Sequence, residues 1–505
     1  METRVRVTLQ RSLYTLVPAL GGFILTYWFI HRSGVGVSPD SIAYVSGAHN
    51  LVQSGHLVDY TTHPLVDFPA GYPLLLAFLM RVTQADPLVI LQFLNPLLFA
   101  LLIGLCGYMA DRMGFPGRWY KPLLLVCVML SPALIEVYIM LWSEAVFVVL
   151  TVLFMITLRR YLYRHSWAAL LVVAAVSALA CTMRYAGVTL VGTAGLLLLL
   201  ERRPSWKQKW AHILSYGLVS VSLLAINLVR NYSVSGTLTG MRQKGVTPLL
   251  RNLYYYGDTF TGWFLFGTTH YQLCLIIGLV LLLLLILLFT RGIRRLAGEY
   301  PAFVGIALTF SLLYSVFMVL SATVSRYEEI NSRLLSPLYV PLVFSLAFPL
   351  AWFTRRASRR FSRRAWRVGA LGVLLLVLSS QLLADYQWYS DVAEGGIGGY
   401  TEDDWDDSPL VKFLEARPSP FLPGYTLYSN SPEGVYFFGG YSCQLLPQKA
   451  FPSTIAPYYA APRQYLVWFD DGTNDAILSL QDVIGHKRMR LVQQFTDGAV
   501  YVSEE

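Results

Sequence analysis

The chain has 505 residues, of which 55% are hydrophobic and only 14% are charged, and its formal net charge is +9. A charged share this far below the usual quarter excludes an ordinary soluble protein. The positive charge does not indicate a nucleic-acid partner, because the arginines flank apolar segments while the tail from Gln387 holds 16 acidic and 7 basic residues.

Apolar segments dominate the chain, and a membrane span needs about 20 such residues. We expect spans at 12–30, 87–110, 122–139, 142–158, 167–183, 186–200, 211–229, 271–290, 302–322, 334–353 and 368–385. The stretch 72–82 is too short to cross and is expected to be re-entrant or interfacial. The sequence therefore predicts a polytopic α-helical membrane protein with about eleven spans.

Basic residues crowd every second connection between these segments. They are Arg4, Arg6, Arg11, Arg112, Arg118, Lys121, Arg159, Arg160, Arg164, Arg202, Arg203, Lys207, Lys209, Arg291, Arg294, Arg295 and the seven arginines of 355–367. Positive charge marks cytoplasmic loops. We therefore expect a cytoplasmic N-terminus and an exterior tail, in an inner or plasma membrane.

Two domains are expected, a transmembrane bundle over 1–386 with outer loops at 31–71 and 230–270, and an extracytoplasmic domain over 387–505. The tail alternates strand-like and helical stretches between turns rich in Pro and Gly, which predicts a small α/β domain. The strands are expected at 425–429 and 464–469, and the helices near 409–416 and 431–438. The acidic run 402–407 is read as a solvated linker, with a cation site as the alternative.

Asp40, in the first outer loop, is the first candidate for chemistry. Ser38 is a good N-cap and Pro39 a favoured first helical residue, so we expect a helix to about Ser54 along the membrane surface. The helix dipole favours an ionised carboxylate here, and such a carboxylate can accept a proton from a hydroxyl or amine. The alternative interpretation is that Asp40 is an ordinary acidic residue at the capped N-terminus of this helix.

A second acidic residue, Glu144, begins the fourth span on the outer side, and Glu136 in the third is a weaker candidate. Acidic residues at the edge of an apolar run usually face protein or water. A simple helix-end charge is the alternative interpretation.

Arg184 and Arg333 lie on the outer side, where topology gives least reason for positive charge. A guanidinium can bind phosphate through two parallel hydrogen bonds, so both side chains are candidates for a phosphate site. Snorkelling, or pairing with Glu328 or Glu329, explains them equally.

Arg242, Lys244 and Arg251 add positive charge to the central outer loop, and Tyr254 to Tyr256 follow. This composition suits a phosphate headgroup and a sugar, and it suits an interfacial aromatic belt equally. The histidines of the first loop, His63 among them, lack a metal-ligand spacing, and no nucleotide-binding glycine loop occurs. No cofactor is predicted. A divalent cation is possible, but no ligand motif in the sequence supports one.

Taken together, these segments resemble the GT-C superfamily of polyprenyl-phosphate-dependent glycosyltransferases, in the branch of protein O-mannosyltransferases and aminoarabinose transferases. The resemblance spans most of the chain and rests on Asp40 with Tyr44, Phe68-Pro69-Ala70-Gly71-Tyr72-Pro73-Leu74, Trp142-Ser143-Glu144, Arg184-Tyr185-Ala186-Gly187 and Arg333-Leu334-Leu335-Ser336-Pro337 with Pro341. The tail segment Ser429-Asn430-Ser431-Pro432-Glu433-Gly434-Val435-Tyr436-Phe437 is similar to tails of bacterial members.

The resemblance implies an inverting transfer of a sugar from a polyprenyl-phosphate donor to an extracytoplasmic glycan, lipid or protein. It implies that Asp40 is the general base, that Glu144 positions acceptor or base, and that Arg333 with Arg184 stabilises the leaving phosphate. Tyr44 and the central-loop cations are further expected donor contacts.

The chain departs from the aminoarabinose transferases, which carry a lysine just before their Pro-Pro, where Asp67 and Phe68 stand here. Phosphate binding must then come from elsewhere, from His63 or the central loop. A lipid or glycan transporter or flippase is the alternative function, and a non-catalytic assembly or receptor protein is a third. The sequence leaves the sugar, the acceptor and the oligomeric state open.

Overall fold

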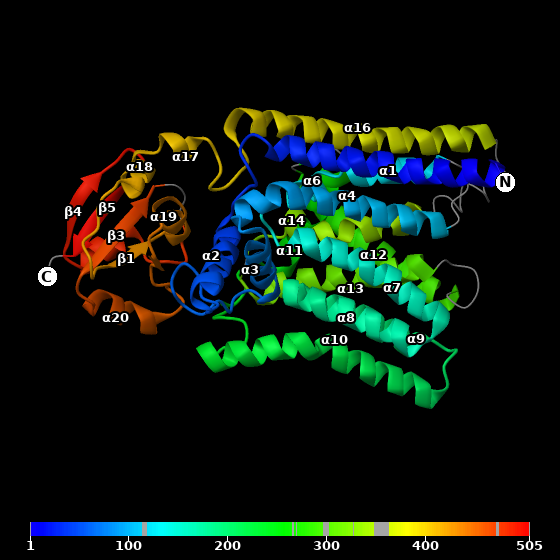
Figure 1. Cartoon of the computed structure of the whole chain (residues 1–505), viewed down its shortest axis with the longest axis horizontal. Helices are drawn as coiled ribbons and strands as arrows, with labels where there is room; N and C mark the ends of the chain where they lie inside the picture. Colours follow the sequence, from blue (N-terminus) through cyan, green and yellow to red (C-terminus); the bar gives the residue numbers. More distant parts are fainter. Residues whose placement is uncertain are drawn as a thin grey trace. The chain divides into compact units, whose positions relative to one another are not determined.

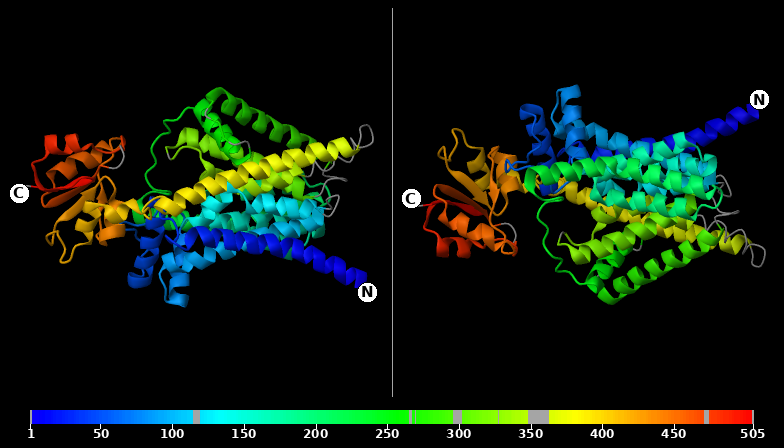
Figure 2. Two further views of the ribbon diagram at one scale, coloured as in Figure 1. Left: turned by 90° about the horizontal axis from the view of Figure 1, so that it is seen from above. Right: turned by 90° about the horizontal axis from the view of Figure 1, so that it is seen from below.

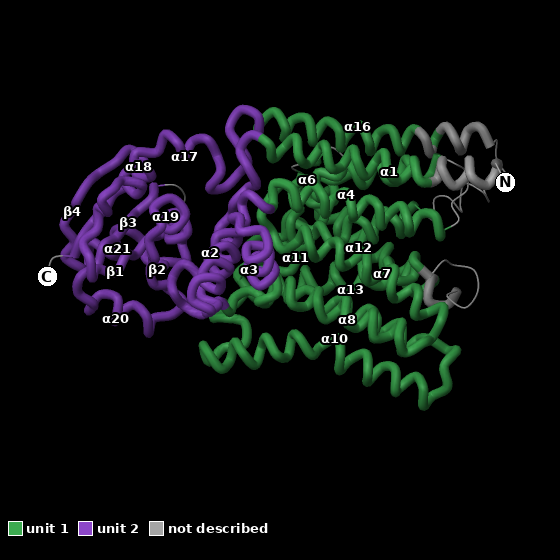
Figure 3. The backbone as a smooth tube through the Cα atoms, viewed as in Figure 1, with its two compact units in different colours: residues 1–31, 66–72, 91–391 green, residues 32–65, 73–90, 392–505 purple. Residues whose placement is uncertain are grey.

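The computed structural model describes residues 2–113, 119–264, 267–268, 270–295, 302–326, 328–347, 363–470 and 474–503. The chain divides into two compact units, coloured separately in Figure 3. We call residues 1–31, 66–72 and 91–391 the helical unit, and residues 32–65, 73–90 and 392–505 the sheet unit.

Long apolar helices that run alongside one another build the helical unit (Figures 1 and 2). Its elements are α1 (Glu2–Ile30), α4 (Pro87–Met113), α5 (Tyr120–Met129), α6 (Pro132–Ile139), α7 (Glu144–Arg164), α8 (Trp167–Met183), η1 (Tyr185–Gly187), α9 (Val188–Leu200), α10 (Trp206–Ser235), α11 (Leu249–Phe264), α12 (Tyr271–Arg295), α13 (Ala302–Val324), α14 (Ser332–Leu335), η2 (Ser336–Leu338) and most of α16 (Arg363–Gly395). Apolar side chains on these helices face outward as well as inward, as expected of helices in contact with lipid.

Six helices of the described residues are long and apolar enough to cross a membrane, namely α1, α4, α7, α10, α12 and α13. The pair α5 and α6 makes a seventh if the two are one span bent by 49°. The break follows from Ser131 and Pro132, which cap and begin α6. The chain is thus a multi-pass helical membrane protein, whereas the count of eleven spans stays a prediction.

Three shorter apolar helices, at 167–183, 185–200 and 332–347, account for part of the difference from eleven. A fourth, at 71–83, is the stretch that we expected to be too short to cross. The expected span 334–353 and the arginine-rich connection 355–367 extend outside the described residues.

Helix α11 packs closely on α12 and lies within the segment 230–270, for which we expected an outer loop. A Cβ atom on Gly257 would lie 1.9 Å from the carbonyl oxygen of Cys274, and one on Gly278 would lie 2.5 Å from that of Leu253. Only glycine permits such an approach of two backbones. This contact fixes the position of α11.

The sheet unit contains a five-stranded mixed sheet in the order β2-β1-β3-β5-β4. The strands are β1 (Thr426–Ser429), β2 (Gln444–Leu445), β3 (Gln464–Phe469), β4 (Met489–Gln494) and β5 (Gly498–Ser503). Strand β1 is parallel to β2 and β3, whereas β5 is antiparallel to β3 and β4. The remaining elements are α2 (Pro39–Ser54), α3 (Gly71–Thr83), α17 (Asp404–Asp407), α18 (Pro409–Glu415), α19 (Pro432–Gly439), η3 (Pro452–Thr454), α20 (Ile455–Ala460) and α21 (Leu480–His486).

Both faces of this sheet are covered. Side chains on β3 alternate, so that Tyr465, Val467 and Phe469 pack with Leu410 of α18 and Val435 of α19. The intervening Leu466 belongs to a second apolar cluster, with side chains of α20 and α21. The predicted small α/β domain is confirmed, and the helices and strands expected within it are present.

Helix α2 forms as the sequence predicts. Ser38 is its N-cap and Pro39 its first residue, and Ser38 and Ser41 complete a capping box. Gly55 ends the helix in the left-handed conformation at φ 76°, which glycine adopts without steric cost. Asp40 lies in the first turn, and Tyr44 is one turn further along the same face.

Candidate active site

A buried cluster of charges lies at the start of α7. Glu144 is completely buried, and its Oε1 contacts Arg184 Nη1 and Arg333 Nε, the latter at 2.7 Å. Arg333 also lies 4.3 Å above the Trp142 ring and reaches Glu328 at 3.5 Å. One carboxylate between two guanidinium groups leaves this trio with one net positive charge.

Local sequence explains how these side chains meet. Ser143 precedes α7, and its hydroxyl accepts a hydrogen bond from Arg184 Nη1 (3.2 Å) and donates one to Glu144 Oε2 (3.3 Å). Asn331 caps the short helix α14 through the Leu334 amide, which places Arg333 in its first turn. The two arginines therefore come from chain segments far apart and converge on one carboxylate.

The residues around Arg184 also hold the segment from Val66 to Gly71 in place. The Tyr185 hydroxyl donates to the carbonyl of Val66 (3.1 Å), and Asn231 Nδ2 donates to the same oxygen (3.3 Å). A Cβ on Gly71 would lie 2.5 Å from the Thr182 carbonyl oxygen. The segment 66–71 and the segment 182–185 are therefore closely packed on one another.

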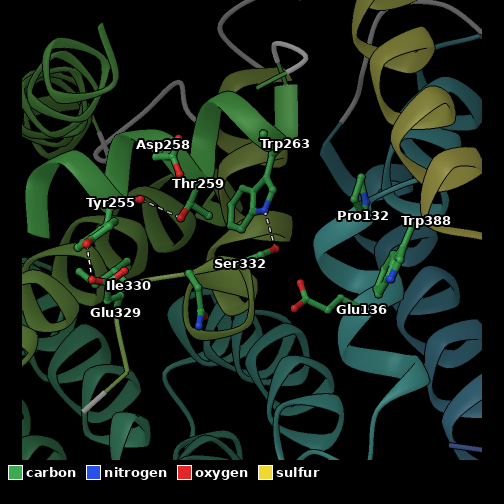
Figure 4. A pocket seen from close by; sticks show the side chains of 12 residues that line it. Pro132, Glu136, Tyr255, Asp258, Thr259, Trp263, Glu329, Ile330, Ser332 and Trp388 are labelled. Atoms are coloured by element: carbon green, nitrogen blue, oxygen red, sulfur yellow. Dashed lines mark hydrogen bonds between the residues drawn. The ribbon is translucent and has the colours of Figure 1, made fainter. Parts of the chain in front are cut away.

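A cavity of about 860 Å³ lies in the helical unit beside this cluster (Figure 4). Three acidic residues line it, namely Glu136, Asp258 and Glu329, together with Tyr255 and two tryptophans, Trp263 and Trp388. Ser332, the neighbour of Arg333, lies in its wall and accepts a hydrogen bond from Trp263 Nε1 (2.9 Å). Aromatic faces with hydrogen-bonding groups around them suit a polyhydroxylated ligand.

Figure 4 shows how the two sides of the cavity are built. Trp263 and Ser332 stand on one side, and Glu136 and Trp388 on the other, with the Glu136 side chain extended between them. No arginine or lysine is among the described residues that line the cavity. Positive charge thus lies next to the cavity, at Arg333, rather than in its wall.

Arg251 reaches the same cavity indirectly. It is exposed, stacks near Tyr254 and Tyr255, and donates to the Tyr255 hydroxyl (3.0 Å), which in turn donates to Glu329. Arg242 is exposed and donates to the carbonyl of Asp67 (2.9 Å). Lys244 is also exposed, and its backbone pairs with that of Ser325.

The sheet unit holds the other expected residues. Asp40 is partly exposed, Tyr44 is buried, and His63 is exposed with its Nδ1 3.0 Å from the Thr61 hydroxyl. Tyr60 donates a hydrogen bond to Glu433 of α19 (3.0 Å). Burial raises the pKa of Glu433, and the negative charges of Asp40 and Asp59 raise it further.

The sequence singled out Arg184, Arg333 and Glu144, whose roles stay predictions, but not the side chains that line the neighbouring cavity. Asp258, Trp263 and Trp388 of the cavity were missed, as were Tyr60 and Glu433 of the sheet unit. The available signal was the amphipathic, aromatic pattern of 249–264, where acidic and aromatic residues recur at helical spacing. Among the described residues no group of three metal-ligating side chains lies close enough to hold an ion.

Neither a protein-family model nor a curated protein matches this sequence. Among solved structures, ArnT from Cupriavidus metallidurans bound to undecaprenyl phosphate has a TM-score of 0.54 and 11% identity over 97% of each chain. The apo state of that ArnT gives 0.48 at 14% identity over 98% of each chain. Arabinofuranosyltransferase AftD from Mycobacteria gives 0.45 at 15% identity, over 97% of this chain and 41% of AftD. The first likeness establishes that this chain has the GT-C fold, as its sequence predicts.

Proposed function

We propose that this protein is a membrane glycosyltransferase that moves a sugar from a polyprenyl-phosphate donor to an acceptor outside the cytoplasm. The observation that carries the proposal is the buried cluster of Glu144, Arg184 and Arg333 beside a cavity of about 860 Å³. This arrangement occurs within a fold shared, over 97% of the chain, with an ArnT structure that holds undecaprenyl phosphate.

The proposed reaction is a single displacement with inversion. The acceptor oxygen or nitrogen bonds to the anomeric carbon while the bond from that carbon to the phosphate oxygen breaks, and the acceptor proton passes to Asp40. The departing polyprenyl phosphate gains a negative charge. Fixed cations aimed at that charge lower the barrier, because they need no reorganisation as it develops.

Each remaining expected residue has a proposed role in this scheme. Glu144 has no exposed surface, so it acts by holding Arg184 and Arg333 in place for the phosphate. Tyr44, one turn from Asp40, and the exposed His63 contact the donor sugar or phosphate. Three further exposed cations raise the local concentration of the anionic donor, and they are Arg242, Lys244 and Arg251.

The orientation belongs to the same proposal. The N-terminus is cytoplasmic, and the sheet unit with Asp40 is exterior, as the distribution of arginines indicates. The donor is then presented from the outer leaflet. The acceptor is a glycan, a lipid or a protein.

The proposal is tested by mass spectrometry of lipid-linked sugars in cells with and without the gene. Loss of transfer leaves the unused polyprenyl-phosphate sugar to accumulate, which identifies the donor. Purified protein in nanodiscs, supplied with that lipid, should transfer the sugar, whereas Asp40→Asn should be inactive while folding normally. Asp404→Asn, at an exposed position of the sheet unit, is the matched control and should be active. Normal turnover by the Asp40→Asn protein rules out the proposed base.

A further inference from the structure

Residues of the C-terminal domain lie next to the loop that follows the Asp40 helix. The Tyr60 hydroxyl donates to Glu433 Oε1 at 3.0 Å, and the Tyr60 and Tyr436 ring centroids are 6.0 Å apart. Gln444 Nε2 donates to the carbonyl of Thr61 at 2.6 Å. The segment around Tyr60 is therefore fixed on α19 and β2.

The start of α2 is tied to the same domain. The Tyr400 amide donates to the Val37 carbonyl at 2.8 Å, and the Tyr400 hydroxyl is 2.7 Å from that of Ser431, the N-cap of α19. Gly399 has φ 95°, and a Cβ there would lie 2.3 Å from the Val37 carbonyl oxygen. Helices α2 and α19 also contact one another. The helix with Asp40 and the helix with Glu433 are thus held against one another within the sheet unit.

Glu433 is the acidic residue of α19, and it is only partly exposed. Its burial raises its pKa, and Asp40 and Asp59 add to that effect, while the hydrogen bond from Tyr60 opposes it. The other titratable groups that interact here are Tyr400, through Tyr60, and Cys443, whose thiol pKa is raised by burial and by Glu433. Glu433 therefore keeps its proton to a higher pH than an ordinary glutamic acid.

We propose that Glu433 is a positioning residue for Asp40, supplied by the C-terminal domain. Helices α2 and α19 are in contact, so while Glu433 is protonated Asp40 is the one of this pair that carries a negative charge, and a phosphate-bearing lipid can approach. Once Glu433 ionises, a second negative charge stands in the same region and repels the phosphate. The inference rests on the proposed function, since it assumes that the lipid phosphate comes to Asp40.

Binding of farnesyl phosphate to the full-length protein in nanodiscs tests the inference from pH 4.5, the ordinary pKa of a glutamic acid, up to pH 8.5. The ionisation of the probe cancels when each variant is compared with the wild type at the same pH. Glu433→Gln is permanently neutral and retains an acceptor for Tyr60. The affinity of this variant relative to wild type should rise about five- to tenfold across the range, as Glu433 ionises in the wild type alone.

Two further variants sharpen the result. Tyr60→Phe removes the hydrogen bond that favours the carboxylate, so the loss of wild-type affinity should move to higher pH. Glu415→Gln changes an exposed carboxylate of α18 and should follow the wild type at every pH. If Glu433→Gln fails to fold, the Tyr60→Phe shift decides the question by itself.

A ratio of affinities between Glu433→Gln and wild type that stays flat with pH overturns the inference, as does an unchanged profile for Tyr60→Phe. Failure of the proposed function looks different. In that case Asp40→Asn keeps its turnover, whatever the pH dependence of farnesyl phosphate binding.

Discussion

Removing the negative charge of the buried cluster is the sharpest test of the structure. Glu144→Gln keeps the size of the side chain but leaves Arg184 and Arg333 side by side without their shared carboxylate. The side chains of these residues are 0%, 16% and 8% exposed, respectively. Water therefore cannot replace the lost charge.

The magnitude follows from burial. Loss of one partner from a buried ion pair costs about 3–5 kcal/mol, because the other charge remains uncompensated. Glu328 still reaches Arg333 at 3.5 Å, but it is 41% exposed and its attraction is screened. We expect a cost near the lower figure, about 3 kcal/mol, which corresponds to a fall of roughly 6 °C in melting temperature for a large domain.

The assay is thermal unfolding of the full-length protein in nanodiscs, followed by tryptophan fluorescence, since Trp142 stacks on Arg333. Glu328→Gln makes the same change of charge at the exposed member of the network and should cost less than about 1 kcal/mol. Glu144→Gln combined with Arg184→Gln should melt above Glu144→Gln alone, because the second change removes an unpaired charge. Equal melting temperatures for Glu144→Gln and Glu328→Gln would refute the reasoning.

Three further predictions concern packing and pH. Gly257→Ala should lower the melting temperature by an amount equivalent to about 1–3 kcal/mol, because its Cβ would overlap a carbonyl of α12, whereas Gly262→Ala on the same helix, with nothing within 4 Å, should not. Leu466→Ala, at a fully buried position of β3, should cost about 2–5 kcal/mol by chemical denaturation, against little for the exposed Leu422→Ala. Burial raises the pKa of Asp59 above its ordinary 3.8, so wild-type stability should fall relative to Asp59→Asn as pH rises from about 4 through the folded-state pKa. Parallel melting curves for these two proteins across pH would contradict that assignment.

Local signals in the sequence predicted the elements well. Ser38, Pro39 and Gly55 set the bounds of α2 because capping depends on adjacent residues alone. The strands at 426–429 and 464–469 follow from short runs rich in apolar and aromatic residues between turns. Strands β2, β4 and β5 were missed: β2 has only two residues, and most residues of β4 are exposed, so that it offers no apolar pattern.

Contacts between residues far apart in the sequence could not be predicted from local sequence patterns. The sequence suggested Glu328 or Glu329 as a partner of Arg333, and Glu328 does reach it, but the closer partner is Glu144, 189 residues away. Helix α11 was expected only as part of the outer loop 230–270; its amphipathic sequence favours a helix, but nothing in that sequence identifies α12 as its partner. Neither relation has a signature in neighbouring residues.

The hydrogen bond between Tyr60 and Glu433 joins positions 373 residues apart. At about 5–20 residues per second, a ribosome needs roughly 20–75 s to travel between them. The amino-terminal half of this contact is therefore made long before its other half exists. The sheet unit, which contains both residues, therefore cannot be completed until the C-terminal strands and helices have been synthesised.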